Sequence, residues 1–270
     1  MKNNKLNKNQ SLKSTIRMSV AGFSLAICSG LANATIVQIE TPLGNFEVNL
    51  YDEKTPETVN NFLNYVNSGA YNNSIIHRSV TDFVIQGGGF SYQNSWPAQA
   101  ITTNAPVINE PVYSNVKGTI AMAKRSGAPN SATSQWFINL ADNSKGNAQL
   151  DSQNGGFTVF GEVTGDGMAI IEQIAALPTY NFSGAFNSLP LQNYGGTGNP
   201  DETHLVINQI TVIDGNTDTA AGLNPPLNTS INTPTTPTTP KSSGGGAAGF
   251  GWILAMLGVA LWRNQLNTRT

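Results

Sequence analysis

Apolar and polar residues alternate in short runs through the middle of this chain, a pattern that is typical of β-strands. Ile36–Glu40 and Asn45–Leu50 alternate on either side of Thr41–Gly44, which predicts an opening hairpin. Ile75–Phe90 holds two further apolar runs and three glycines just before Phe90, and His204–Ile213 is the last alternating run. Many short strands joined by glycine-rich loops predict a mainly β domain.

Two segments have helical spacing instead. Thr55 and Pro56 are a capping residue and a first-turn proline, and Gly69 marks the end of the helix that they begin. The apolar stripe expected on this helix is Val59, Phe62, Leu63 and Val66. A second helix is expected from about Gly167 to Ala176, and its inward residues are Met168, Ile171 and Ile174 or Ala175.

Residues 1–34 have the composition of an export signal. The cationic residues at their start are Lys2, Lys5, Lys8, Lys13 and Arg17. The apolar stretch 18–31 follows, and Ala32-Asn33-Ala34 offers a cleavage site. A membrane anchor is the alternative, although the apolar run is short for a span. Cys28 allows a lipoprotein signal as a further alternative, but Ile27 is bulky where a small residue is expected.

The other end of the chain divides into two parts. Residues 223–243 are rich in proline and threonine, as in an extended linker. Residues 244–270 begin with glycines, continue as an apolar run over 247–262 and include Arg263 and Arg269. This tail resembles the glycine-glycine sorting signals of some Gram-negative bacteria, which a membrane protease is thought to cut. A permanent membrane anchor is the alternative. Residues 35–222 remain as one domain.

Charge and cysteine content exclude several classes of function. Six basic residues stand against sixteen acidic ones between Thr35 and Pro240, which is the wrong balance for binding nucleic acid. Cys28 is the only cysteine, so after cleavage at Ala34 neither a disulfide nor a thiolate is available. With only His77 and His204 as histidines, we expect no metal site and no cofactor.

Arg78 is unusual for its position. It stands among the apolar runs that include Phe83, and burying an unpaired charge is costly. A lone arginine at such a place would be expected to extend from a strand edge into solvent. Two segments further along the chain, 131–139 and 157–161, change this interpretation of Arg78.

These segments together resemble the cyclophilin family of peptidyl-prolyl isomerases. The matching pieces are His77-Arg78, Phe83 to Gly88, Gly118 to Ala123, Ser134 to Ile138 and Val159-Phe160-Gly161. Their order and spacing agree with the family from about Ile36 to Ile213. The resemblance implies a closed eight-stranded antiparallel β-barrel with a helix capping each end. It also implies catalysis of X-Pro bond rotation in unfolded or extended polypeptides.

The resemblance assigns roles to particular residues. Arg78 is expected to be the electrostatic catalyst, and Gln86 and Gln135 are expected to position the substrate. The candidates for substrate binding are Phe83, Val84, Met122, Ala123, Gln135, Phe137 and Leu150. Met122 and Phe137 have a structural alternative as barrel core, and Gln86 could tie down a loop. His77 is expected to be a buried neighbour and not a proton shuttle.

Several residues depart from the family pattern. Val84 stands where methionine is usual, Gln149 where an aromatic residue is common, and Phe157 where many eukaryotic members have histidine. The loop 124–130 is longer than its eukaryotic counterpart, so the asparagine that binds substrate backbone there has no clear equivalent. Catalysis remains compatible with these changes, whereas cyclosporin binding should be weak without the aromatic residue.

Two other functions compete with this interpretation. A non-catalytic peptide-binding or chaperone module at the cell surface would keep the groove and lose turnover, but it would have less need of Arg78. A surface adhesin or stalk protein would fit the tail and the Asn/Thr content. The leading hypothesis is an exported, monomeric isomerase in the periplasm or at the surface of a Gram-negative bacterium. Its partners would be proline-containing polypeptides and a C-terminal sorting protease, with membrane contact only through the C-terminal segment.

Overall fold

The computed structural model describes residues 35–215, 219–220 and 222–231. The predictions of an export signal in residues 1–34 and of a sorting or membrane segment in 244–270 lie outside the described residues, as does most of the linker. Among the helices that are described, none combines the length and apolar character that crossing a membrane requires.

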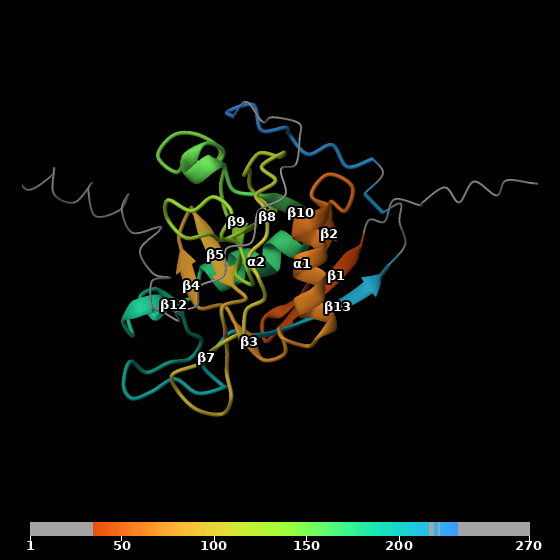
Figure 1. The fold of residues 1–270 in the computed structure, drawn as a ribbon. Helices are drawn as coiled ribbons and strands as arrows, with labels where there is room; N and C mark the ends of the chain where they lie inside the picture. Colours follow the sequence, from red (N-terminus) through yellow and green to blue (C-terminus); the bar gives the residue numbers. More distant parts are fainter. Residues whose placement is uncertain (1–34, 216–218, 221, 232–270) are drawn as a thin grey trace, which may run out of the picture. The chain divides into compact units, whose positions relative to one another are not determined.

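The described chain is mainly β and contains two α-helices, α1 (Pro56–Asn67) and α2 (Gly167–Ala175) (Figure 1). The strands are β1 (Ile36–Thr41), β2 (Gly44–Leu50), β3 (Ser74–Ile75), β4 (Arg78–Val80), β5 (Val84–Gly87), β6 (Phe90–Ser91), β7 (Gln99–Ala100), β8 (Thr119–Met122), β9 (Trp136–Asn139), β10 (Val159–Val163), β11 (Thr179–Tyr180), β12 (Leu189–Pro190) and β13 (Ile207–Asp214). Short 3-10 helices occupy Gln153–Gly155 and Gly184–Phe186.

Eleven strands pair antiparallel in the order β4-β5-β9-β8-β10-β2-β1-β13-β3-β6-β7, and β11 pairs with β12 separately. The mainly β class and the two helices are therefore as predicted. The pairings form a series with two ends, β4 and β7, where a closed ring of eight strands was expected. The very short strands β6 and β7 account for part of this difference, because no alternating pattern of that length can be recognised in a sequence.

The segment 74–80 is shared between two distant parts of this series. Its start, β3, pairs with β13, and its end, β4, pairs with β5. Between them the N–H of Ile76 donates to the carbonyl of Val206, and the N–H of His77 donates to the carbonyl of Gln86. Arg78, the first residue of β4, is therefore held by backbone pairing on both sides of this segment.

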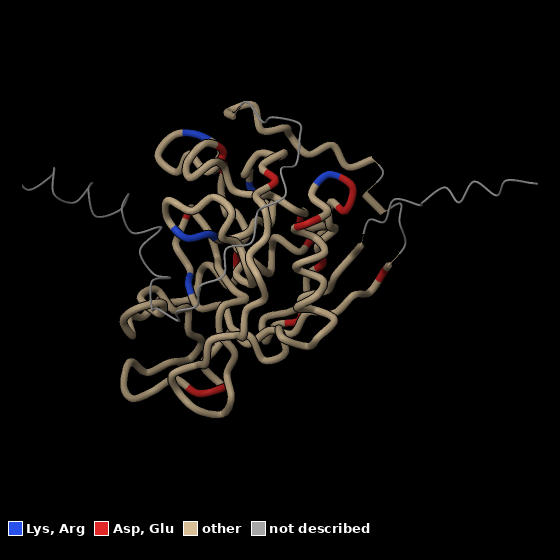
Figure 2. The backbone as a smooth tube through the Cα atoms, viewed as in Figure 1, with Lys and Arg blue, Asp and Glu red and all other residues tan. Residues whose placement is uncertain are grey.

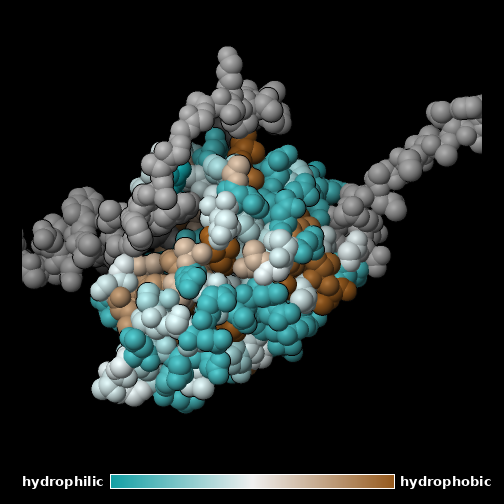
Figure 3. Space-filling model, turned by 60° about the horizontal axis from the view of Figure 1, so that its bottom comes forward, coloured by the Kyte–Doolittle hydropathy of each residue, from teal (hydrophilic) through white to brown (hydrophobic). Residues whose placement is uncertain are grey.

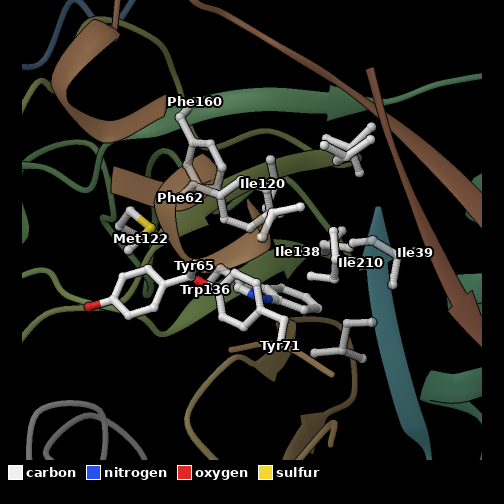
Figure 4. Packing of buried hydrophobic residues seen from close by; sticks show 14 of the residues in the cluster. Ile39, Phe62, Tyr65, Tyr71, Ile120, Met122, Trp136, Ile138, Phe160 and Ile210 are labelled. Atoms are coloured by element: carbon white, nitrogen blue, oxygen red, sulfur yellow. The ribbon is translucent and has the colours of Figure 1, made fainter. Parts of the chain in front are cut away.

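The helices and the inner side chains of the sheet form the main core (Figure 4). Helix α1 begins at Pro56 and ends before Gly69, as predicted, and it packs against β13 while α2 packs against β2. The buried residues of the predicted stripe are Val59, Phe62 and Val66, and those of α2 include Ile171 and Ile174. Trp136 and Phe160 are fully buried in this core, and the Phe160 ring lies against the Phe62 ring of α1. Hydrophobic spacing thus placed both helices.

Residues 223–231, the described part of the predicted linker, lie against the domain. The N–H of Asn228 donates to the carbonyl of Val112 over 2.8 Å, and the N–H of Ser114 donates to the carbonyl of Pro226 over 2.8 Å. The Asn228 side chain also donates to the carbonyl of Asp151 over 2.8 Å. These hydrogen bonds attach the described part of the linker to the surface of the domain.

Charged and apolar residues are dispersed over the surface of the described chain. Its few lysines and arginines are spread along the tube without forming a continuous basic stripe (Figure 2). On the face drawn in Figure 3, apolar atoms form patches interrupted by polar ones. Val212, Ile213 and Leu227 are the large hydrophobic residues that stand out as exposed in this part of the chain.

Candidate active site

A row of side chains crosses five neighbouring strands of the sheet. The residues that pair directly across these strands are Arg78 (β4), Gln86 (β5), Phe137 (β9), Ala121 (β8) and Val159 (β10). Directly paired residues of antiparallel strands lie on the same face of a sheet. The alternate residues Ile85, Ile138 and Ile120 belong to the main core on the other face. The register thus brings three of the candidate residues, Arg78, Gln86 and Phe137, together on one face.

Arg78 is half-buried at one end of this row. Its Nη1 donates to Gln86 Oε1 over 3.5 Å, and its guanidinium carbon lies 5.9 Å from the centre of the Phe83 ring. Burial lowers the pKa of Arg78 from its ordinary value, but a guanidinium remains charged at neutral pH. Within residues 35–231, as far as they are described, no carboxylate forms an ion pair with it. No carboxylate of this described part therefore neutralises its charge.

Two glutamine side chains continue from the arginine. Gln86 Nε2 donates to Gln135 Oε1 over 2.8 Å, so Arg78, Gln86 and Gln135 form one hydrogen-bonded series. Gln86 is buried and Gln135 is half-buried, which leaves Gln135 closer to solvent. This arrangement orients the arginine through Gln86 and presents a neutral amide beside it.

Glycines allow Gln135 to lie this close to β5. A Cβ added at Gly89 would stand 2.9 Å from Gln135 Cδ. Gly88 has a φ of +72°, and a Cβ there would stand only 2.5 Å from the carbonyl oxygen of Ser134. The glycine run is therefore required by the close approach of residues 134–136 to the end of β5.

His77 is buried immediately before the arginine. Its ring meets the Phe90 ring edge-on, with 5.1 Å between the centroids. Burial, followed by the positive charge of Arg78, lowers the pKa of His77 to about 3. The imidazole is thus neutral at physiological pH, which agrees with the prediction that His77 is a buried neighbour of the arginine.

The apolar candidates gather on the same face as the row. Val84, Phe137 and Leu150 are buried in one cluster, and Phe83 and Ala123 are half-buried at its margin. Phe157, in the position that the family often gives to histidine, lies edge-on to Phe137 with 5.9 Å between the ring centroids. These residues, next to Arg78 and Gln135, form an apolar site bordered by one cation and one amide.

Met122 is the one candidate that the structure does not bring to this face. It pairs with Trp136 and is fully buried in the main core (Figure 4). The reason is the alternation of β8, which directs Ala121 and Ala123 to the face of the row and Met122 to the opposite face. The core alternative considered for this residue describes its place.

Lys124 has a place in this site that the sequence did not reveal. It is 6% exposed, and its Nζ lies 4.7 Å from the centre of the Phe157 ring. Burial lowers the pKa of Lys124 to about 7. Its position directly after Ala123 was the only available signal, because the groups that it contacts are about thirty residues away in the chain.

Comparisons with known proteins agree with this geometry. The family model described as cyclophilin-type peptidyl-prolyl cis-trans isomerase matches residues 36–194. A peptidyl-prolyl cis-trans isomerase of Acinetobacter baylyi is 42% identical over 175 residues, which cover 64% of this chain and 88% of the relative. Peptidyl-prolyl cis-trans isomerase A of Dickeya dadantii is 42% identical over 177 residues, and this aligned region covers 64% of this chain and 86% of that relative. Peptidyl-prolyl cis-trans isomerase B of Escherichia coli is 41% identical over 161 residues, and this aligned region covers 58% of this chain and 94% of that relative.

Proposed function

Since this chain belongs to the cyclophilin family of peptidyl-prolyl cis-trans isomerases, we propose that it accelerates X-Pro bond rotation by non-covalent electrostatic stabilisation of the twisted amide. Its substrates would be extended or unfolded polypeptides that contain proline, and its effect would be to assist their folding. No cofactor is needed for this reaction, because no bond is made or broken.

The chemistry requires a site that favours the twisted amide over both planar forms. Rotation about the bond is slow because amide resonance imposes a barrier of about 18–20 kcal/mol. Twisting localises the lone pair on the prolyl nitrogen, so a fixed cationic donor directed there acts mainly in the transition state. Arg78 suits this role, because Gln86 orients its guanidinium and no carboxylate among the described residues pairs with it.

The neighbouring groups would hold the substrate. The apolar cluster around Phe137, with Phe83 and Ala123 at its margin, offers a surface for the proline ring. Gln135 would anchor the substrate backbone through its amide, which lies beside the arginine series. The observation that carries the proposal is the in-register row in which Arg78, Gln86 and Phe137 meet on one face.

A protease-coupled isomerisation assay on the purified full chain tests this function. We expect Arg78→Ala to lower kcat/KM by about 10²–10³-fold, as the loss of one transition-state donor typically does. Lys145→Ala, which removes an exposed positive charge, is the matched control and should retain wild-type turnover. Wild-type protein that binds proline peptides without isomerising them would refute the proposal and support a non-catalytic peptide-binding or chaperone module.

We further propose that the protein works outside the cytoplasm on exported proteins, in the periplasm or at the cell surface. The support is the sequence of residues 1–34 and 244–270, which resemble an export signal and a sorting signal cut by a membrane protease. The intact mass of the protein recovered from cell fractions tests this, because cleavage after Ala34 would remove the first 34 residues. An uncut chain in the cytoplasmic fraction would contradict it.

A further inference from the structure

A buried lysine adjoins the apolar side of the site. Lys124 follows Ala123 and directs its Nζ to the carbonyl oxygens of Asn154, at 3.0 Å, and Gly156. Among the residues that the structure describes, no carboxylate forms an ion pair with Lys124. An ammonium group in this position is therefore held by backbone oxygens and by the Phe157 ring.

The backbone that receives Lys124 has an unusual conformation. Asn154, Gly155 and Gly156 are three successive residues with positive φ, at 53°, 76° and 74°. A left-handed conformation costs about 1–2 kcal/mol at a residue that is not glycine. Asn109 completes the arrangement, because its Nδ2 donates to the carbonyls of Gly155 and Gly156 over 2.8 and 2.9 Å. The side chains of Lys124 and Asn109 thus donate hydrogen bonds to the backbone carbonyls of all three residues.

A buried ammonium and a strained loop are each unfavourable alone. Burial disfavours the protonated form of the Lys124 amine, and a left-handed backbone conformation is energetically unfavourable at Asn154 because this residue has a Cβ. Each group offsets the cost of the other. The carbonyls of Asn154 and Gly156 take the place of water around the ammonium, and the ammonium stabilises the backbone conformation that presents these carbonyls. Lys124 and residues 154–156 therefore form one structural unit.

The loop that Lys124 holds leads directly into the apolar cluster of the site. Phe157 follows Gly156 directly, and its N–H donates to the carbonyl of Leu150 over 2.8 Å. Its ring lies against Phe137, the central apolar residue of the row. Leu150 and Phe157 are the two ends of the loop that Lys124 holds. A change in the loop would consequently move two walls of the apolar cluster.

We infer that Lys124 is a positioning residue for the proline-binding surface, which holds the carbonyls of Asn154 and Gly156 and thereby fixes Phe157 against Phe137. The inference deepens the proposed function and rests on it. The side-chain hydrogen bonds that the structure describes for Lys124 go to Asn154 and Gly156, outside the Arg78–Gln86–Gln135 series, so its loss should weaken substrate binding and leave the rotation step unchanged. A purely structural role would lower stability without separating KM from kcat.

The test compares Lys124→Met with Lys145→Met in the full chain, at mildly acidic pH, where the ammonium is protonated. Methionine keeps an unbranched apolar stem, one atom shorter than lysine, but removes the charge, and Lys145 is an exposed lysine that serves as the control. We expect Lys124→Met to raise KM about five- to tenfold with kcat within about twofold, as the loss of hydrogen bonds from a charged donor would do. Amide hydrogen exchange over residues 150–157 should become faster in this variant alone.

An unchanged KM in folded Lys124→Met would overturn the inference, as would a fall in kcat at constant KM. If that variant fails to fold, Asn109→Ala removes the other donor to the Gly156 carbonyl, together with the donor to the Gly155 carbonyl, and should raise KM in the same direction. An unchanged KM in Asn109→Ala would then overturn it. The Kd of a proline peptide, measured by calorimetry, separates the two proposals. Inactive wild-type protein would refute the proposed function, whereas equal Kd values for wild type and Lys124→Met would refute only the role of Lys124.

Discussion

The glycines at the end of β5 provide a direct test of how the site is packed. Gly88→Ala introduces two separate costs. Its φ of +72° disfavours any residue with a Cβ, and the new Cβ would stand 2.5 Å from the Ser134 carbonyl oxygen and 2.7 Å from Trp136 Cδ1. That carbonyl also accepts a hydrogen bond from the Tyr71 hydroxyl at 2.7 Å, so it cannot move freely.

Gly146→Ala is the matched control for the backbone term. Gly146 has a φ of +68°, and an added Cβ would meet no atom within 4 Å. Both variants should lose about 1 kcal/mol from the left-handed conformation. Only Gly88→Ala should lose a further 1–3 kcal/mol or so from overpacking. Urea unfolding of the full chain measures the free energy of unfolding of each variant.

The difference between the two variants therefore isolates the steric contribution. We expect Gly88→Ala to be less stable than Gly146→Ala by about 1–3 kcal/mol, with similar dependence on urea concentration. We also expect a higher KM in Gly88→Ala, because Ser134 immediately precedes Gln135. Equal free energies of unfolding in the two variants would refute the reasoning, since the close approach to Ser134 would then cost nothing.

Two further predictions concern Lys124 and the departure at Gln149. The pKa of Lys124 is about 7 in the folded protein and 10.5 in an ordinary lysine, so between these values the unfolded chain binds more protons at this site. Stability should therefore rise with pH in that window by on the order of 4 kcal/mol relative to Lys124→Met, and parallel unfolding curves for the two proteins across this window would contradict it. Cyclosporin should inhibit weakly, because Gln149 is exposed and not aromatic; nanomolar inhibition in the isomerase assay would show that this departure is unimportant.

Much of the fold follows from short-range sequence patterns. Pro56, the apolar stripe of α1 and Gly69 define one helix through local spacing alone, and the hairpin of β1 and β2 follows from alternation around one turn. Arg78, Gln86 and Phe137 were grouped as candidates by the family resemblance, because alternation fixes the faces within one strand but not the register between strands. Met122 could have been placed by the same rule, since Ala121 and Ala123 flank it on the other face.

The rest depends on contacts between distant parts of the chain. The loop that receives Lys124 owes its form to left-handed backbone at residues 154–156, and no local pattern links those residues to position 124. The pairing of β3 with both β13 and β6 involves only two residues of β3, which is too short for a periodic signal. Packing of residues 223–231 against Val112 and Ser114 was similarly invisible in a segment rich in proline and asparagine.

The division of segment 74–80 between two partners has a consequence for when the protein becomes active. Ile75, at the start of this segment, pairs with Ile207 in the last strand, while Arg78 pairs with Gln86 close by in the sequence. A chain that is synthesised from its N-terminus can form the second pairing early, but it lacks the first until β13 has emerged. The strand that carries the arginine is thus completed by nearly the last residues of the domain to appear. A partly synthesised chain would lack the first of these pairings, so we expect activity only once the whole domain has been made.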